Sequence, residues 1–464
     1  MQTKALTIQP IPRVTENRAK WWPISGHSAA ASGFLGTRTS SASGEGLIAQ
    51  SPRRSRTKSK RSGKQFSTLM TLTYLSILAA CGGSMASQKS CSTVPPSTTC
   101  TVNCVTIPPP PQFLYATSTE NILAFTINQS TGALSTLQTL AGPNQSNGMV
   151  ASPYGQLYVS DFLNDAVDGY SISSSGGLTA ITGSPFSLGG ASPGAGGLTA
   201  FAAGAYFYAT DINAGTVAGF LNNPSSGTLT PVPGSPFPAG NTPVQAAQTE
   251  GAFLYVCDLN DSEGGISAFA INAQNGALTP VPGSPFPTGA VGSFPGPSAM
   301  VVSGYNDFLY VALAGTTSAN NQIAAFAIDQ TTGSLTPAPG SPFLTGNQPR
   351  QMAFLPYAAG AYSFLYTGNV QDGTISAFTA DNTTGVLTPV SGSPYPAGSS
   401  IGGLAAVTAA SQSASLFLYQ SDPQAQSVRA YIIDATTGAL SAVSGSPFSA
   451  SGYAPTLLTS AVGP

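Results

Sequence analysis

The chain has 464 residues, a formal net charge of −2 and only 7% charged residues, and its charges divide sharply along the sequence. Residues 1–80 carry twelve lysines or arginines and two acids. Residues 82–464 carry three basic residues (Lys89, Arg350 and Arg429) and fifteen acids. An acidic surface repels phosphate groups, so the larger part of the chain is unsuited to binding nucleic acid or an anionic membrane surface.

The N-terminal region combines three features in the order expected of an export signal. We expect residues 1–65 to be a disordered extension, or sequence upstream of the true start, that ends in the basic cluster 53–64. An apolar run over 66–80 follows, with the length of a signal-peptide core rather than a membrane span. It ends in Leu78-Ala-Ala-Cys81-Gly82, which resembles the lipobox of bacterial lipoproteins. The segment 66–81 therefore predicts export and lipidation of Cys81. Anchoring is expected in the cell envelope, at the outer membrane if the host has one.

Residues 82–111 are rich in Ser, Thr and Pro, a composition typical of an extended tether. The tether holds Cys91, Cys100 and Cys104, and an oxidising compartment would allow one disulfide among them, with the pairing left open. Cys257 lies in an apolar strand-like run and is interpreted as a small buried hydrophobic residue.

From residue 112 onward one tetrapeptide, Gly-Ser-Pro-aromatic, recurs six times at intervals of about fifty residues. The copies begin at Gly183, Gly234, Gly283, Gly340, Gly392 and Gly445. Self-similarity at this period is the signature of stacked or radial supersecondary units. The repeats predict a single repeat domain over 112–464.

Each repeat reads as four short strands bounded by Gly, Pro and Asn, which is the content of one propeller blade. A Gly-x-Leu hairpin signal joins the third strand to the fourth, and the closing aromatic ring is expected to pack between blades. Counting one tyrosine per second strand gives seven blades: Tyr115, Tyr158, Tyr208, Tyr255, Tyr310, Tyr366 and Tyr419. The sequence therefore predicts an all-β, seven-bladed β-propeller of four-stranded antiparallel blades. Its first blade is expected to be completed by a C-terminal strand near 455–461.

Polar residues follow the second strand in six of the seven units, and two of the following loops are rich in acids. Asx-type turns account for the polar residues, and a calcium site is a weaker alternative. The acids of the two loops are Asp161, Asp165, Asp168, Asp258, Asp261 and Glu263. No other cofactor is indicated.

The unit 253–279, with Phe253-Leu-Tyr-Val, Ile266-Ser-Ala-Phe and Gly276-Ala-Leu-Thr, resembles the lactonase family. These are seven-bladed propellers related to 6-phosphogluconolactonase and to the YVTN-repeat surface proteins. The resemblance covers 112–464. It implies a pocket lined by innermost strands that read Pro-Arg-His. Here Pro349-Arg350-Gln351 matches the arginine and replaces the histidine by glutamine, which cannot exchange a proton near neutral pH.

Two functions follow, and they differ in chemistry. Because the propeller has no histidine or lysine, we expect a lipid-tethered binding or scaffold module that takes a small molecule, a glycan or a protein at one face. The alternative is a lactone or ester hydrolase for an extracytoplasmic substrate, in which Arg350 and Gln351 meet a carboxylate such as Glu250 or Asp307. A quinoprotein-type redox propeller is a remote third possibility. We expect a monomer that contacts the membrane only through its lipid.

Overall fold

The computed structural model describes residues 109–464 except 191, 200–205, 251, 260–264, 290–295, 306, 316–320, 357–361 and 410–414. The chain divides into two units, 1–107 and 108–464, and the fold described here is that of the second. The four N-terminal cysteines, Cys81 among them, and also Asp261 and Glu263, lie outside the described residues. Within the described ranges, no helix reaches the length and apolar character that a membrane span requires.

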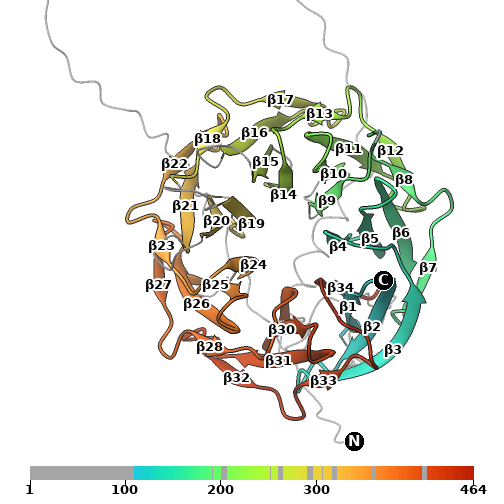
Figure 1. Cartoon of the computed structure of the whole chain (residues 1–464), viewed down its shortest axis with the longest axis vertical. Coiled ribbons are helices and arrows are strands. Elements are labelled where there is room, and N and C mark those ends of the chain that lie inside the picture. Colours follow the sequence, from blue (N-terminus) through green and yellow to red (C-terminus); the bar gives the residue numbers. More distant parts are fainter. Residues whose placement is uncertain are drawn as a thin grey trace, which may run out of the picture. The chain divides into compact units, whose positions relative to one another are not determined.

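Seven antiparallel sheets built from the described residues are arranged radially around one axis (Figure 1). The innermost strands are β34 (Leu458–Val462), β4 (Met149–Ala151), β9 (Ala195–Leu198), β14 (Pro243–Gln248), β19 (Gly296–Val302), β24 (Pro349–Leu355) and β29 (Leu404–Thr408). The second strands are β1 (Gln112–Thr117), β5 (Gln156–Asp161), β10 (Tyr206–Asp211), β15 (Phe253–Asp258), β20 (Phe308–Ala314), β25 (Tyr362–Asn369) and β30 (Leu416–Asp422).

The third strands are β2 (Asn121–Ile127), β6 (Ala166–Ile172), β11 (Thr216–Asn222), β16 (Gly265–Ile271), β21 (Gln322–Ile328), β26 (Thr374–Asp381) and β31 (Ser427–Ile433). The outer strands are β3 (Leu134–Ala141), β7 (Leu178–Ala180), β12 (Leu229–Pro231), β17 (Leu278–Pro280), β22 (Leu335–Pro337), β27 (Leu387–Pro389) and β32 (Leu440–Ala442). The predicted seven-bladed propeller is confirmed, and every predicted tyrosine lies on a second strand.

The recurring Gly-Ser-Pro-aromatic segment adds a short fifth strand to six of the seven sheets. Except in the first blade, the outer strand has three residues and pairs only with the end of the third strand. The chain then turns back, and its aromatic residue starts a two-residue fifth strand that pairs with the beginning of the third. These are β8 (Phe186–Ser187), β13 (Phe237–Pro238), β18 (Phe286–Pro287), β23 (Phe343–Leu344), β28 (Tyr395–Pro396) and β33 (Phe448–Ser449).

The ring closes through the C-terminus, as predicted. Strand β34 pairs antiparallel with β1 from Gln112↔Val462 to Ala116↔Leu458 and completes the first blade as its innermost strand. Beyond the strand, the Thr456 amide donates to the Thr117 carbonyl at 2.7 Å. The β1 edge is thereby paired, and the first blade has an innermost strand like those of the other six blades.

The hydrophobic core lies between the blades. Each of its seven clusters combines buried side chains from two neighbouring blades, and the cluster of the seventh and first blades closes the circle. The half-buried closing aromatics pack against six of these clusters, as expected from the sequence. No blade can bury its apolar faces without both neighbours, so the ring stabilises itself as a unit.

A second ring, of hydrogen bonds, runs through the same interfaces. The hydroxyl of each second-strand tyrosine donates to the hairpin-glycine carbonyl of the next blade, at 2.6 to 3.4 Å. The pairs are Tyr115–Gly176, Tyr158–Gly227, Tyr208–Gly276, Tyr255–Gly333, Tyr310–Gly385, Tyr366–Gly438 and Tyr419–Gly132. Two repeated sequence features therefore meet as donor and acceptor.

Candidate functional site

The two edges of the propeller differ in which chain segments they hold. At one edge, called here the entry edge, the chain arrives through the connection from the preceding blade and begins the innermost strand. The turn between the second and third strands of the same blade lies at this edge too. In the sixth blade the Val370 amide donates to the Gln348 carbonyl at 3.0 Å, which joins that turn to that connection. The hairpins between innermost and second strands lie at the opposite edge.

Four consecutive innermost strands are irregular at the entry edge. Strands β9, β14, β19 and β24 each carry a register shift against their second strand in the first residues. In three of them the shift follows a proline, Pro243, Pro297 or Pro349, which has no amide hydrogen for the ladder. A bulge places an extra residue on one strand and re-aims its side chain.

We call the extra residues the bulge row. They are Gly196 and Gly197 in β9, Val244 in β14, Ser298 in β19 and Arg350 in β24. Strands β9, β14, β19 and β24 follow one another around the ring (Figure 1). The bulge row therefore lies on four neighbouring blades, and Arg350 is its last member in the sequence.

Members of the bulge row contact their neighbours across blades. The Ser298 hydroxyl donates to the Pro349 carbonyl at 2.6 Å and so contacts the residue before Arg350. Gln245, directly after the bulge in β14, lies over Gly197, where a Cβ would collide with its side-chain oxygen. The glycines of β9 therefore leave the space that the glutamine occupies. Sequence reasoning missed Ser298 and Gln245, although the Pro-x-x pattern at three strand starts was visible in the sequence.

The predicted binding residues Arg350 and Gln351 both lie in this region. Arg350 is exposed and Gln351 is half-buried. The ion pair between Arg429 Nε and Asp422, at 3.6 Å, is the only salt bridge among the described residues, so Arg350 is the one described cation outside a salt bridge. An exposed guanidinium presents five N–H donors, which suit a carboxylate or a developing oxyanion.

The two acids suggested as partners for Arg350 lie elsewhere. Glu250 follows β14, and Asp307 directly precedes β20, so both belong to hairpins at the opposite edge. A seven-residue strand such as β24 is about 23 Å long, which separates the two edges. The topology therefore does not bring Arg350 together with Glu250 or Asp307. At the entry edge, Asp372 accepts from the amide of Asn347, three residues before Arg350, at 2.7 Å.

Acids after the second strands act mainly as turn and connection anchors. Asp211 accepts from the Ala214 amide at 3.0 Å and Asp422 from the Ala425 amide at 3.0 Å, which are Asx-type turns as expected. Asp258 accepts from Asn241 and Thr242 in the connection from the third blade. Among the described residues, no group of three or more His, Cys, Asp or Glu side chains is placed to hold a metal ion.

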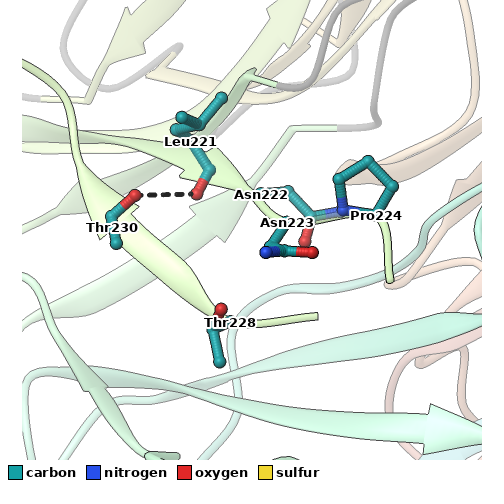
Figure 2. Close-up of a pocket in the computed structure, with 6 residues that line it drawn as sticks. All are labelled: Leu221, Asn222, Asn223, Pro224, Thr228 and Thr230. Atoms are coloured by element: carbon teal, nitrogen blue, oxygen red, sulfur yellow. Dashed lines mark hydrogen bonds between the residues drawn. The ribbon is translucent and has the colours of Figure 1, made fainter. Parts of the chain in front are cut away.

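A separate hollow of about 340 Å³ lies at the outer hairpin of the third blade (Figure 2). It is lined by Leu221, Asn222, Asn223, Pro224, Thr228 and Thr230, and so by no titratable side chain. The Thr230 hydroxyl of this hairpin donates a hydrogen bond to the Leu221 carbonyl at 3.4 Å. Without a titratable side chain the hollow offers no general base to activate its threonine hydroxyls, and we do not take it as the candidate site.

Comparison with known proteins agrees with the architecture. The sequence profile of the lactonase family, described as a seven-bladed β-propeller, matches residues 98–402. No curated protein sequence matches the chain significantly.

Solved structures resemble the propeller at low sequence identity. The periplasmic gluconolactonase of Pseudomonas aeruginosa has 16% identity and a TM-score of 0.58, over 76% of this chain and 100% of that one. A Bacteroides fragilis protein, provisionally assigned as a 6-phosphogluconolactonase, has 16% identity and a TM-score of 0.58, over 76% of this chain and 98% of that one. At this identity the likeness shows the fold. The profile match places the chain in the lactonase family of seven-bladed β-propellers.

Proposed function

We propose that the propeller is a lactone hydrolase whose substrate binds at the bulge row. The observation that carries the proposal is Arg350, an exposed arginine outside any described salt bridge, set on a bulge of an innermost strand. Membership of the lactonase family supports a lactone as the ligand class. This favours the hydrolase alternative over the non-catalytic scaffold that the sequence first suggested.

Lactone opening needs water to attack the ring carbonyl carbon and a donor to stabilise the resulting oxyanion. The Arg350 guanidinium supplies the donor. The Gln351 amide orients the attacking water, because it both donates and accepts. Residues 90–464 contain no histidine or lysine, so the proton acceptor is a carboxylate of the entry edge. The ring C–O bond then breaks, and the protonated carboxyl group returns its proton to the leaving ring oxygen. The product is a hydroxy acid, which ionises to a carboxylate near Arg350.

The charge of the propeller indicates the kind of lactone. Residues 112–464 hold fifteen acids and two arginines, and one of these arginines is paired with Asp422. A phosphorylated lactone would meet repulsion with a single free cation to offset it. We therefore expect hydrolysis of unphosphorylated lactones and little or none of 6-phosphogluconolactone.

The test is a lactone panel assayed with the purified protein by proton release. Arg350→Ala should lower kcat by about a hundred- to a thousandfold, the range for loss of an oxyanion donor. Arg429→Gln serves as the matched control, because it removes the same charge at an ion-paired position. Equal activity of wild type and Arg350→Ala, or turnover confined to 6-phosphogluconolactone, would contradict the proposal.

We also propose that the protein is exported and anchored by a lipid on Cys81, on the strength of the basic cluster, apolar run and lipobox in sequence order. An extracytoplasmic position would give the propeller access to environmental lactones. Cys81→Ala should leave the protein unprocessed or release it from the membrane fraction. Unchanged size and unchanged fractionation would refute the anchor.

A further inference from the structure

In the fourth and seventh blades, the connection from the preceding blade is held by the carboxylate that ends the second strand. Asp258, at the end of β15, accepts from the Asn241 and Thr242 amides of the connection before β14. Asp422, at the end of β30, accepts from the Ser399 amide at 3.1 Å. In both cases the carboxylate binds the segment that leads into the innermost strand of the same blade.

The connection between the second and third blades departs from this pattern. In the third blade the carboxylate that ends the second strand is that of Asp211, on β10. Gly190 has the same place in the repeat as Asn241 and Ser399. Gly190 donates instead to Asp165 Oδ2, at 2.9 Å. Asp165 belongs to the preceding blade, so it has taken the donor that Asp211 would have used.

Asp165 occupies a turn position that glycine holds in other blades. Its φ is 49°, and the corresponding residues Gly215 and Gly373 have φ of 68° and 63°. Those glycines lie against the Gly240 and Gly398 carbonyls, and a Cβ there would collide with them. Gln426 has the same position in the seventh blade, with a φ of 49°, so what sets residue 165 apart is its carboxyl group. In both residues the left-handed conformation disfavours a side chain.

Because residue 165 is an aspartate, two buried carboxyl groups lie side by side. Asp165 is 6% exposed and Asp211 is 1% exposed. A Cβ added at Gly190 would collide with a carboxylate oxygen of each, so both groups border the same small space. Asp165 Oδ1 and Asp211 Oδ2 are buried without a hydrogen-bond partner among the described residues. Two buried carboxylates side by side cannot both stay ionised at low cost.

The surroundings supply no compensating positive charge. The connection 188–194 carries no titratable side chain. The other titratable groups on the strands packed around the pair are tyrosines or acids: Tyr158 and Asp161 on β5, Asp168 and Tyr170 on β6, and Tyr206 and Tyr208 on β10. Burial, and secondarily the charge of Asp211, raise the pKa of Asp165 to about 6.

We propose that Asp165 and Asp211 form a carboxylic acid–carboxylate pair that holds one proton in the folded propeller and releases it to solvent as pH rises, loosening the connection between the second and third blades. The proton fills the gap between the two carboxyl groups as a hydrogen bond. Its loss leaves two buried negative charges that repel each other. Asp165 is bound to this connection through Gly190 and also accepts, through its carbonyl, from the Leu188 amide at 2.9 Å. The connection leads into β9, whose Gly196 and Gly197 belong to the bulge row.

The sign of the effect follows from linkage. The folded pKa lies above the unfolded value of 3.8, so the added stability is complete below pH 3.8 and disappears as pH rises through about 6. Between pH 5 and 7.5 the shift alone lowers the folding equilibrium constant about tenfold.

The experiment compares urea denaturation of the wild type and of Asp165→Gly at pH 5 and pH 7.5. Asp165→Gly restores the residue type of the third and sixth blades and frees the Gly190 amide for Asp211. We expect the wild type to lose about tenfold more in folding equilibrium constant than the variant across this interval. Amide protection factors over 188–199, which correct for the intrinsic rise of exchange with pH, should fall between pH 5 and 7.5 in the wild type alone. Asp258→Asn is the matched control at a junction where the described residues place one carboxylate, and it should weaken folding at both pH values.

Two results would overturn the proposal. One is an equal pH dependence of stability in the wild type and Asp165→Gly. The other is a calcium-dependent rise in stability at pH 7.5 that the wild type shows and the variant lacks, which would make the pair a cation site. Neither readout depends on lactone turnover, so these experiments test the inference independently of the proposed function.

Discussion

Ring closure between the seventh and first blades provides a sharp test of how the propeller is held together. The Tyr419 side chain is fully buried, and its hydroxyl donates to the Gly132 carbonyl at 3.0 Å, across 287 residues of sequence. Burial raises the pKa of the Tyr419 hydroxyl, so this group stays protonated and acts as a donor throughout the working range. Tyr419→Phe keeps the ring and removes only this donor.

The expected loss follows from the buried acceptor. Without Tyr419 the Gly132 carbonyl loses this donor in a site that excludes water, a situation that costs about 1–3 kcal/mol of unfolding free energy. Urea denaturation should show a lower midpoint and an unchanged slope, because the fold and its buried surface are retained.

Tyr395→Phe is the matched control. The Tyr395 hydroxyl also donates to a backbone carbonyl, that of Ser391 at 2.8 Å, but this bond is solvent-exposed and within one blade. Its removal should change the unfolding free energy by less than about 0.5 kcal/mol. If Tyr419→Phe cost no more than Tyr395→Phe, the hydrogen-bond ring would not stabilise the closure.

Three further outcomes test other parts of the structure. Deleting residues 453–464 removes β34 and opens the β1 edge, so the melting temperature of the whole propeller should fall; a truncated protein that melts like the full one would refute closure by the C-terminus. Gly333→Ala should destabilise folding, because φ is 76° and the new methyl group would collide with the Phe253 ring; a neutral result in thermal denaturation would contradict the tight fit. Burial, and secondarily Asp161, raise the pKa of Asp168 to about 6, so Asp168→Asn should reduce the loss of stability between pH 5 and 7.5; an unchanged pH profile would refute this.

The sequence by itself determined the repeating architecture. Each unit carries its own strand and turn signals, and the residues that bring them about lie within about fifteen positions of one another. The hairpin glycine at 276, for example, takes a φ of 74°, as a tight turn requires. The sequence also showed that the first unit lacks an innermost strand. It showed one additional strand after the last unit, near the C-terminus. Local chemistry therefore sufficed for the blades, their number and the closure.

Only the tertiary structure decided which residues of different blades meet. Tyr255 and Gly333 each looked like a feature of its own strand or turn, and their hydrogen bond spans 78 residues. Glu250 seemed a plausible partner for Arg350, but strand direction places the two at opposite edges. Asp165 and Asp211 became a pair because a turn of one blade reaches the connection into the next. Contacts between blades depend on the twist and packing of neighbouring sheets, and no local sequence pattern encodes these.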